Sequence, residues 1–275
     1  MAAVVAVVPT LGKNQSRLTA TIDSIKRNTT HENLQIVVVK NSDANLSYLD
    51  DKVDTILSFG VNLGNVGSLE YVRRHYSCEY LWILQDDMVI LNNNLEALIS
   101  SFVVNPKLAV ASPIVSRFGT VPARSRAGVF TNIEKTRWEN YPFTDIAVED
   151  VDLSYDFCFV AGSGALFRTE ALSAVGGFDL NLYPLMHVDV DICIRLLRAG
   201  WQICLNPEAL IDHQVSGSRN ARLSKAVLQR NTQYLHDRLE TDFTEHVESY
   251  TPLDEDILFA IARRSSQLFL EVSEI

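Results

Sequence analysis

Two pairs of aspartates lie where their carboxylates could bind a metal ion or transfer a proton. Asp86 and Asp87 directly follow an apolar run that ends at Leu84. Adjacent carboxylates at the end of a strand repel each other unless solvent or a cation offsets their charge, and carboxylate oxygens are the ligands that hard divalent cations prefer. An acidic surface turn would have the same local sequence. The pattern therefore leaves two interpretations open, a metal site and an acidic turn.

The second pair, Asp189 and Asp191, lies at the start of a helical pattern that ends before Gly200. Residues two apart on a helix point to different sides, so the two carboxylates should have different roles. Asp191 is placed to pair with Arg195 one turn later. Asp189 lies near the helix N-terminus, where the helix dipole favours a negative charge. A chemical role and a helix-capping role are both open for Asp189.

Two histidines could join these carboxylates. His213 follows the strand-like segment 210–212, and its importance depends on whether it meets the first aspartate pair in space. His187 lies two residues before Asp189, where it could contact a substrate or fill a gap in the packing. A structural role is the alternative for both histidines.

Alternating strands and helices should position these residues. Apolar runs predict buried strands, and apolar residues at helical spacing predict helices between them, with Ser16 as a candidate N-cap of the first helix. Such an order favours a parallel sheet covered by helices, whose ligand crevice lies at the carboxyl ends of the strands. The predicted strands are residues 4–8, 34–39, 56–59, 80–84 and 108–112. Three polar segments fall at strand ends: Pro9–Thr10, Lys40–Asn41 and Gln85–Asp87.

Composition excludes some classes of protein. The formal net charge of −10 argues against a general nucleic-acid binder, which needs a basic surface. The apolar residues 1–9 are too short to span a bilayer and lack the basic start of a signal peptide, although a peripheral membrane contact stays open. The four cysteines form no CxxC pair, which favours free thiols in a reducing compartment and hence a cytoplasmic location.

Several segments taken together resemble the family-2 glycosyltransferases, and especially their rhamnosyltransferase-like branch. The most specific part is the order of a Gly-Gly-Phe-Asp block at 176–179, an Asp-Val-Asp helix start at 189–191 and the late His213. The likeness covers roughly residues 3–218, and its segments are Val5–Ile25, Asn62–Gly67, Trp82–Val89, Gly162–Arg168, Val175–Asp179, Asp189–Leu196 with Ala199–Trp201, and His213.

This resemblance implies a GT-A type α/β fold with a mostly parallel central sheet flanked by helices. It implies a transferase domain over residues 1–218, with a nucleotide-binding half at about 1–115 and an acceptor half at about 116–218, followed by a C-terminal helical extension at 219–275. The activity would be inverting transfer of a hexosyl or deoxyhexosyl group from a UDP-, dTDP- or GDP-linked donor, assisted by Mn²⁺ or Mg²⁺. The acceptor would be a saccharide, a lipid-linked molecule or another small molecule.

The resemblance also implies roles for particular residues. Asp189 matches the general base, which takes the proton of the acceptor hydroxyl during in-line attack, so that the anomeric centre is inverted. Asp87 would bind the metal, His213 would complete the metal and diphosphate site, and Asp86 would contact the ribose or the metal. The other donor-binding residues would be Pro9, Thr10, Asn41, Asn62 and Gly64.

The sequence departs from the family pattern at three positions. Gln85 stands where the first aspartate of the metal motif is common, Val188 where a glutamate usually precedes the base, and Lys40 where an aspartate often helps to bind the nucleobase. These departures leave a second hypothesis open, a catalytically weak saccharide- or partner-binding protein on the same fold. A sugar nucleotidyltransferase is a third hypothesis, but it requires a glycine-rich basic phosphate loop, which residues 11–14 resemble only faintly.

Two other regions have open roles. Three arginines and a tryptophan lie in the region where an acceptor would bind: Arg117, Arg124, Arg126 and Trp138. Tryptophans often stack on sugar rings, but a tryptophan buried in the core is more common. Two amphipathic helical stretches, at about 227–235 and 257–269, could pack over the domain, form a homodimer interface or cover the acceptor.

Overall fold

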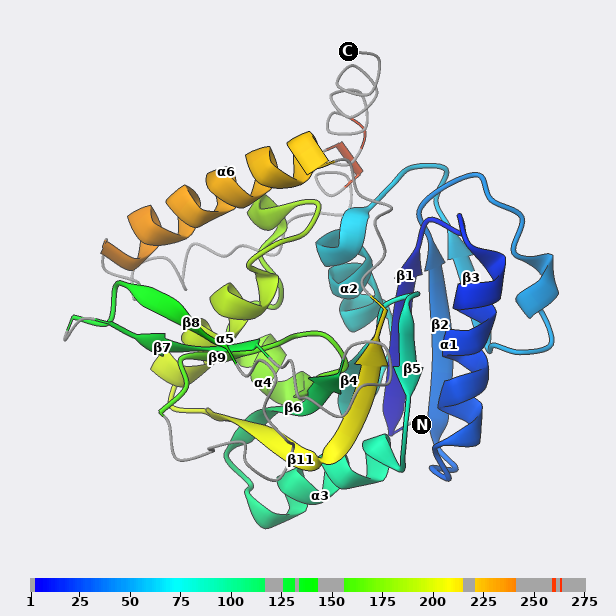
Figure 1. Cartoon of the computed structure of the whole chain (residues 1–275), viewed down its shortest axis with the longest axis horizontal. Coiled ribbons are helices and arrows are strands. Elements are labelled where there is room, and N and C mark those ends of the chain that lie inside the picture. Colours follow the sequence, from blue (N-terminus) through cyan, green and yellow to red (C-terminus); the bar gives the residue numbers. More distant parts are fainter. Residues whose placement is uncertain are drawn as a thin grey trace.

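A mixed sheet of eight strands forms the centre of the computed structural model, which describes residues 3–116, 126–131, 134–142, 156–214, 221–240, 259, 260 and 263 (Figure 1). Its strand order is β3-β2-β1-β4-β10-β6-β11-β5. The bounds are Val4–Thr10 for β1, Leu34–Lys40 for β2, Thr55–Ser58 for β3, Tyr80–Ile83 for β4, Met88–Ile90 for β5, Leu108–Ser116 for β6, Leu166–Arg168 for β10 and Gln202–His213 for β11.

The first half of the sheet follows the alternating pattern of the sequence. Strands β3, β2, β1 and β4 are parallel neighbours, connected through α1 (Gln15–Arg27) and α2 (Gly64–His75). The apolar residues of β1 are buried on both faces, as a strand with helices on either side requires. The predicted cap at Ser16 is wrong: the helix begins at Gln15, two residues earlier than a cap at Ser16 implies, and the side chain of Asn14 caps it by accepting a hydrogen bond from the Arg17 amide at 3.0 Å.

The second half of the sheet is mixed. The short strand β10 lies antiparallel between β4 and β6, and β5 pairs antiparallel with β11 at the edge. The parallel pairs are β1–β2, β1–β4, β2–β3 and β6–β11, so four of the seven pairings are parallel. Strand β6 runs four residues beyond its predicted end, because its pairing with β11 resumes after a register shift and continues to Ser116.

A three-stranded sheet in the order β8-β7-β9 lies beside the central sheet. Its strands are β7 (Arg126–Phe130), β8 (Trp138–Pro142) and β9 (Phe159–Val160). Helix α5 (Val188–Arg198) contacts β9, and Figure 1 shows α6 (Ala221–Glu240) along the same side of the molecule, above α5. The remaining helical elements are η1 (Ser47–Leu49), α3 (Asn94–Val104), α4 (Thr169–Ala174) and η3 (Leu180–Leu182).

Two apolar cores cover the two faces of the central sheet. One contains α1 and α3 residues with one face of the strands, and the other contains α2, α4 and α5 residues with the opposite face. The predicted α6 stripe is confirmed, because Val227, Asn231 and Leu235 are buried, so this helix packs over the domain. Arg117, Arg124 and the second predicted stretch, 257–269, apart from residues 259, 260 and 263, lie outside the described residues, as does the side chain of Arg126.

None of the helices in the described ranges is long and apolar enough to cross a membrane. The four cysteines are free thiols, of which Cys158 and Cys193 are buried. Burial raises the pKa of Cys158 to about 12, so this thiol stays protonated near neutral pH.

Candidate active site

The carboxyl ends of β1 and β4 meet, as the sequence predicts. The hydroxyl of Thr10 donates to Asp86 Oδ2 at 2.5 Å and accepts a hydrogen bond from the Gly12 amide at 2.9 Å. Burial raises the pKa of Asp86, against the hydrogen bond from Thr10, and the neighbouring carboxylate of Asp87 raises it further. Pro9 lies half-buried one residue earlier. This edge therefore holds two adjacent carboxylates, one of them stabilised by a threonine hydroxyl.

Asp87 and His213 come together at the edge of the sheet. Strand β5, which begins directly after Asp87, pairs with the end of β11, and His213 Nε2 faces Asp87 Oδ1 at 3.1 Å. Asp87 is 5% exposed, and within the described part of the chain the buried Nε2 of His213 makes no hydrogen bond. Two ligand atoms bound at about 2.1 Å to one octahedral ion lie about 3 Å apart, so the pair fits a shared divalent cation.

This pair alone does not complete a metal site. Among the described residues, no three His, Cys, Asp or Glu side chains come together in an arrangement that could hold a metal ion. A cation at Asp87 and His213 would therefore need further ligands from substrate or water, which is how Mg²⁺ commonly binds beside phosphates.

The loop before α2 is held by the side chains of two asparagines. Asn41 is 6% exposed, and its Oδ1 accepts from the Leu63 amide at 2.9 Å while its Nδ2 donates to Ser68 Oγ at 3.0 Å. Asn62 Oδ1 accepts from the Gly64 amide at 2.8 Å. Gly64 has φ +67°, and a Cβ there would lie 2.8 Å from Pro184, so only glycine fits. In this structure Asn41, at the end of β2, and Asn62 shape the loop before α2.

A glycine turn links the acidic motif to Asp189. Gln85, which directly precedes Asp86, donates from Nε2 to Ser163 Oγ at 3.3 Å, and the amide of the adjacent Gly162 donates to Asp189 Oδ2 at 3.3 Å. A Cβ at Gly162 would lie 3.2 Å from the Cβ of Asp189, which is tight. The start of α5 and the end of β4 therefore lie on either side of one turn.

The two aspartates of α5 have different surroundings, as predicted. Asp189 is half-buried, and its Oδ1 accepts a hydrogen bond from the Val190 amide at 3.0 Å. Asp191 is 1% exposed and forms an ion pair with Arg195, whose Nε lies 2.9 Å from Asp191 Oδ2. The amides of Gly162 and Val190 leave other oxygen lone pairs of the Asp189 carboxylate unused.

His187 packs between α6 and the second sheet. Its Nε2 lies 2.8 Å from Thr232 Oγ1, and the Thr232 hydroxyl donates its one hydrogen to the Leu228 carbonyl, so His187 Nε2 carries the proton in this contact. Trp138 lies edge-on to the imidazole at 5.9 Å. Burial lowers the pKa of His187, against the charge of Asp189, so the ring is neutral at pH 7.

Two residues near Asp86 were not predicted from the sequence. The charge of Arg17, in the first turns of α1, acts on Asp86 and lowers its pKa, opposing the effect of burial. Tyr48 in η1 lies near enough that Asp86 adds to the effect of burial in raising the pKa of the phenol. A basic residue early in the helix after β1 was a usable signal for Arg17. Tyr48 lies in a polar connection that has no distinctive pattern.

A family model described as "Glycosyltransferase like family 2" matches residues 2–235. The chain belongs to this family. The match extends from β1 into α6, and it includes the acidic motif, the glycine turn and Asp189. A comparison with curated proteins finds no match.

Solved glycosyltransferase structures share the family-2 chain's fold. GalNAc-T7 with UDP, GalNAc and Mn²⁺ aligns with a TM-score of 0.61 and 12% identity, over 78% of this chain and 44% of that one. TarS of S. aureus aligns with a TM-score of 0.53 and 13% identity, over 78% of this chain and 37% of that one. A structure of its residues 1–349 aligns with a TM-score of 0.51 and 12% identity, over 77% of this chain and 60% of that one. At such identities the likeness shows the fold alone, which is GT-A-like and confirms the predicted class. The chain spans less than two thirds of the length of each of these proteins.

Proposed function

We propose that this family-2 protein transfers a sugar from a nucleoside-diphosphate sugar to an acceptor hydroxyl with inversion, and that Asp189 is its general base. One observation carries the proposal: the turn at Gly162 and Ser163 contacts Asp189 on one side and Gln85 of the acidic motif on the other. A base and a donor-binding motif must lie on either side of the reacting carbon, and this turn brings the two together.

The donor would lie along the carboxyl ends of β1, β2 and β4. Thr10 and Asp86 would contact the nucleoside, with Pro9 beside them, while Asn41, Asn62 and Gly64 would shape the adjoining loop. The first-turn amides of α2 are occupied, because the amides of Asn65 and Val66 donate to the Pro184 carbonyl at 2.7 and 3.3 Å. The diphosphate would therefore lie nearer Asp87 than the N-terminus of α2.

Asp87 and His213 would hold the divalent cation, Mn²⁺ or Mg²⁺. When bound there, such a cation offsets the negative charge that develops on the departing diphosphate. A carboxylate and an imidazole suit Mn²⁺ well, and the remaining positions would take diphosphate oxygens and water. The GalNAc-T7 structure contains UDP and Mn²⁺, so a UDP-linked donor is the first to test, before dTDP- and GDP-linked ones.

Asp189 would take the acceptor's proton. Its carboxylate is half-buried and is held by the amides of Gly162 and Val190, so its direction is fixed while lone pairs stay open to a hydroxyl. The oxygen–carbon bond forms as the carbon–diphosphate bond breaks, and attack from the opposite side inverts the anomeric centre. His187 is neutral at pH 7 and leaves the negative charge of Asp189 in place.

The acceptor class, the rhamnosyltransferase-like branch and the hexosyl or deoxyhexosyl donor remain proposals that rest on the resemblance. Trp138 is half-buried in β8, and His236 stacks on its ring at a centroid distance of 4.5 Å, so at most one ring face is open to a saccharide, lipid-linked or other small acceptor. The cytoplasmic location and a homodimer through the C-terminal helices also stay predictions.

A binding protein on the same fold is the second candidate. The observation in its favour is that Gln85 supplies no ligand charge and that its side chain is hydrogen-bonded to Ser163. Such a protein would bind a saccharide or nucleotide and release no nucleoside diphosphate.

Thermal unfolding with and without Mn²⁺ tests the donor site. We expect the melting temperature to rise with one nucleoside diphosphate among UDP, dTDP and GDP, only when Mn²⁺ is present, and the rise to disappear in Asp87→Ala. Asp50→Ala is the control, because Asp50 is exposed on η1 and should leave the rise unchanged. A folded wild-type protein that responds to no nucleotide would contradict the donor site.

Product analysis then separates the two candidates. A transferase should release nucleoside diphosphate from the matching donor, and NMR should show an anomeric configuration opposite to that of the donor. Nucleotide binding with no release from any donor would favour the binding protein.

A further inference from the structure

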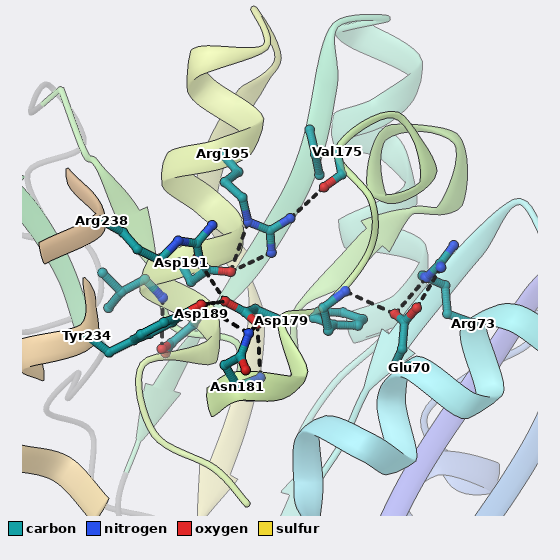
Figure 2. A network of polar contacts seen from close by, with 12 residues as sticks. Glu70, Arg73, Val175, Asp179, Asn181, Asp189, Asp191, Arg195, Tyr234 and Arg238 are labelled. Atoms are coloured by element: carbon teal, nitrogen blue, oxygen red, sulfur yellow. Dashed lines mark hydrogen bonds and ion pairs between the residues drawn. The ribbon is translucent and has the colours of Figure 1, made fainter. Parts of the chain in front are cut away.

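Helix α6 lies against the segment that leads into the candidate base. Three consecutive residues of α6, Arg230, Asn231 and Thr232, contact residues 182–187, directly before α5. Figure 2 shows two further side chains of α6, Tyr234 and Arg238, pointing toward Asp179 and Asp191. The sequence resemblance ended at about residue 218, and the sequence left three roles open for this helix: packing over the domain, a homodimer interface or a cover over the acceptor.

Asn231 makes the central contacts. It is 0% exposed, and its Nδ2 donates to the carbonyls of Leu182, Leu185 and Met186 at 3.1, 2.9 and 2.9 Å. Its Oδ1 accepts from Arg230, which in turn donates to the Tyr183 carbonyl. One buried amide group therefore binds three backbone carbonyls within five residues of the chain.

The segment needs this support because its backbone is strained. Met186 and His187 have φ of +78° and +61°, and each is an L-residue in the left-handed region, which is unfavourable for a residue other than glycine. Such conformations persist when surrounding contacts fix them. Here Asn231 holds the Met186 carbonyl and Thr232 holds the His187 ring, two residues before Asp189.

The other side of the segment binds the loop before α2. The Tyr183 hydroxyl donates to the Asn62 carbonyl at 2.7 Å, and the Pro184 carbonyl accepts from the Asn65 amide at 2.7 Å. Residues 182–187 therefore lie between the donor-side loop and α6, and they lead directly to the start of α5. A shift of this segment would move Asp189 relative to the donor site.

The C-terminal half of α6 is fixed by buried charge. Arg238 Nη1 lies 2.5 Å from Asp179 Oδ2 and 3.1 Å from Asp191 Oδ1, and the Tyr234 hydroxyl donates to Asp179 at 2.7 Å (Figure 2). Asp179 and Asp191 flank the segment that Asn231 binds. The helix is therefore anchored at a second point, which allows it to serve as a rigid support.

We propose that Asn231 is a positioning residue, which fixes the direction of the Asp189 carboxylate through the backbone of residues 182–187. The proposal rests on the proposed function, in which Asp189 is the base. A displacement of about 1 Å at a reacting group can lower a rate by about 100-fold, so such a support affects turnover more than substrate binding.

The test compares Asn231→Asp with Gln233→Ala. Aspartate has the shape of asparagine but cannot donate, so it loses all three carbonyl contacts. We expect kcat to fall by about 10- to 100-fold, with the KM for the donor changed less than about threefold. Gln233 is exposed two residues further on, and its side chain donates to Asp237 within the same helix, so its variant should keep both constants. A folded Asn231→Asp enzyme with kcat within about twofold of wild type would overturn the proposal.

A milder variant covers the case in which Asn231→Asp does not fold. Thr232→Val keeps the shape of the side chain and removes the contact with His187 together with the hydrogen bond to the Leu228 carbonyl within α6. We expect kcat to fall while the thermal shift with nucleotide and Mn²⁺ stays unchanged. An unchanged kcat in folded Thr232→Val would count against the proposal.

Amide hydrogen exchange separates this proposal from the proposed function. Faster exchange across residues 182–189 in Asn231→Asp or Thr232→Val than in Gln233→Ala would support the positioning role of Asn231, whether or not the protein turns over a nucleotide sugar. Equal exchange overturns it. A wild-type protein that releases nucleoside diphosphate from no donor defeats the proposed function alone.

Discussion

Two regions of the molecule hold aspartates in opposite electrostatic surroundings: Asp179 and Asp191 lie in one, and Asp86 and Asp87 in the other. In the region between α5 and α6, Asp179 and Asp191 are at most 1% exposed and are neutralised by Arg238 and Arg195. At the carboxyl edge of the sheet, Asp86 and Asp87 are adjacent like charges, and their repulsion contributes to the raised pKa of Asp86.

This difference separates the carboxylates that stabilise the fold from those that we propose to bind a ligand. A buried carboxylate that receives arginine hydrogen bonds has its charge balanced by the fold itself. Asp86 and Asp87 are adjacent carboxylates beside a histidine, and a bound cation would offset their mutual repulsion. Asp189 lies between the two regions, held by backbone amides and half-exposed. The predictions below test this division, beginning with the largest effect.

Asp189→Asn should lower kcat by about 10²- to 10⁴-fold, the contribution of a general base. Asparagine keeps an oxygen that can accept from the Gly162 or Val190 amide, so the melting temperature should change little. Steady-state kinetics with the matching nucleotide sugar and thermal unfolding measure the two quantities. Its counterpart is Asp191→Asn, two residues along the same helix, which should lose stability because it removes the carboxylate that pairs with Arg195 and one of the two carboxylates that pair with Arg238. If Asp189→Asn retained wild-type kcat, the base would have to be another residue.

Arg238→Met should lower the free energy of unfolding by about 3–5 kcal/mol, because it leaves the buried carboxylates of Asp179 and Asp191 less compensated. Urea unfolding measures the change. The matched control is Arg137→Met, which breaks the ion pair with Glu240, whose side chains are 53% and 51% exposed. A pair so exposed contributes about 1 kcal/mol or less. Equal losses of unfolding free energy in the two variants would mean that the buried ion pairs of Arg238 contribute no more to stability than the exposed pair of Arg137 and Glu240.

The sequence was informative where the structure depends on local patterns. Continuous apolar runs predicted β1, β2 and β4, and the rule for parallel sheets then placed Thr10 beside Asp86. The spacing of Asp191 and Arg195 predicted their ion pair, because residues four apart on a helix are neighbours. These features need only one element, or two strands whose pairing follows from their order.

Other features depend on contacts that no local pattern encodes. The three residues of β10 separate β4 from β6, and their pairing partner Trp82 is more than eighty residues away. Asn14 and Ser16 are both good caps, and a spacing of two residues could not distinguish them. Asn231 looked like one member of an amphipathic stripe, and its role follows only from the backbone of residues 182–187.

The smallest expected effect is a rise in stability from Asp86→Asn in the metal-free protein. Burial raises the pKa of Asp86 above its ordinary value, so the folded state binds this proton more tightly than the unfolded state does. Stability due to this group is therefore present at low pH and is lost as pH rises through the folded pKa. Asparagine carries no charge and can still accept from Thr10, so the variant should be slightly more stable than wild type at pH 7, and the difference should shrink on acidification.

Thermal unfolding from pH 3 to pH 8 in the presence of a chelator measures this difference. With Mn²⁺ and the matching nucleotide the order should reverse, because the wild-type carboxylate then has a positive partner and the variant does not. A variant that is less stable than wild type at pH 7 without metal would mean that Asp86 is already compensated within the fold. Asp86 would then belong with Asp179 and Asp191 as a structural carboxylate, and Asp87 with His213 would be left as the candidate cation site.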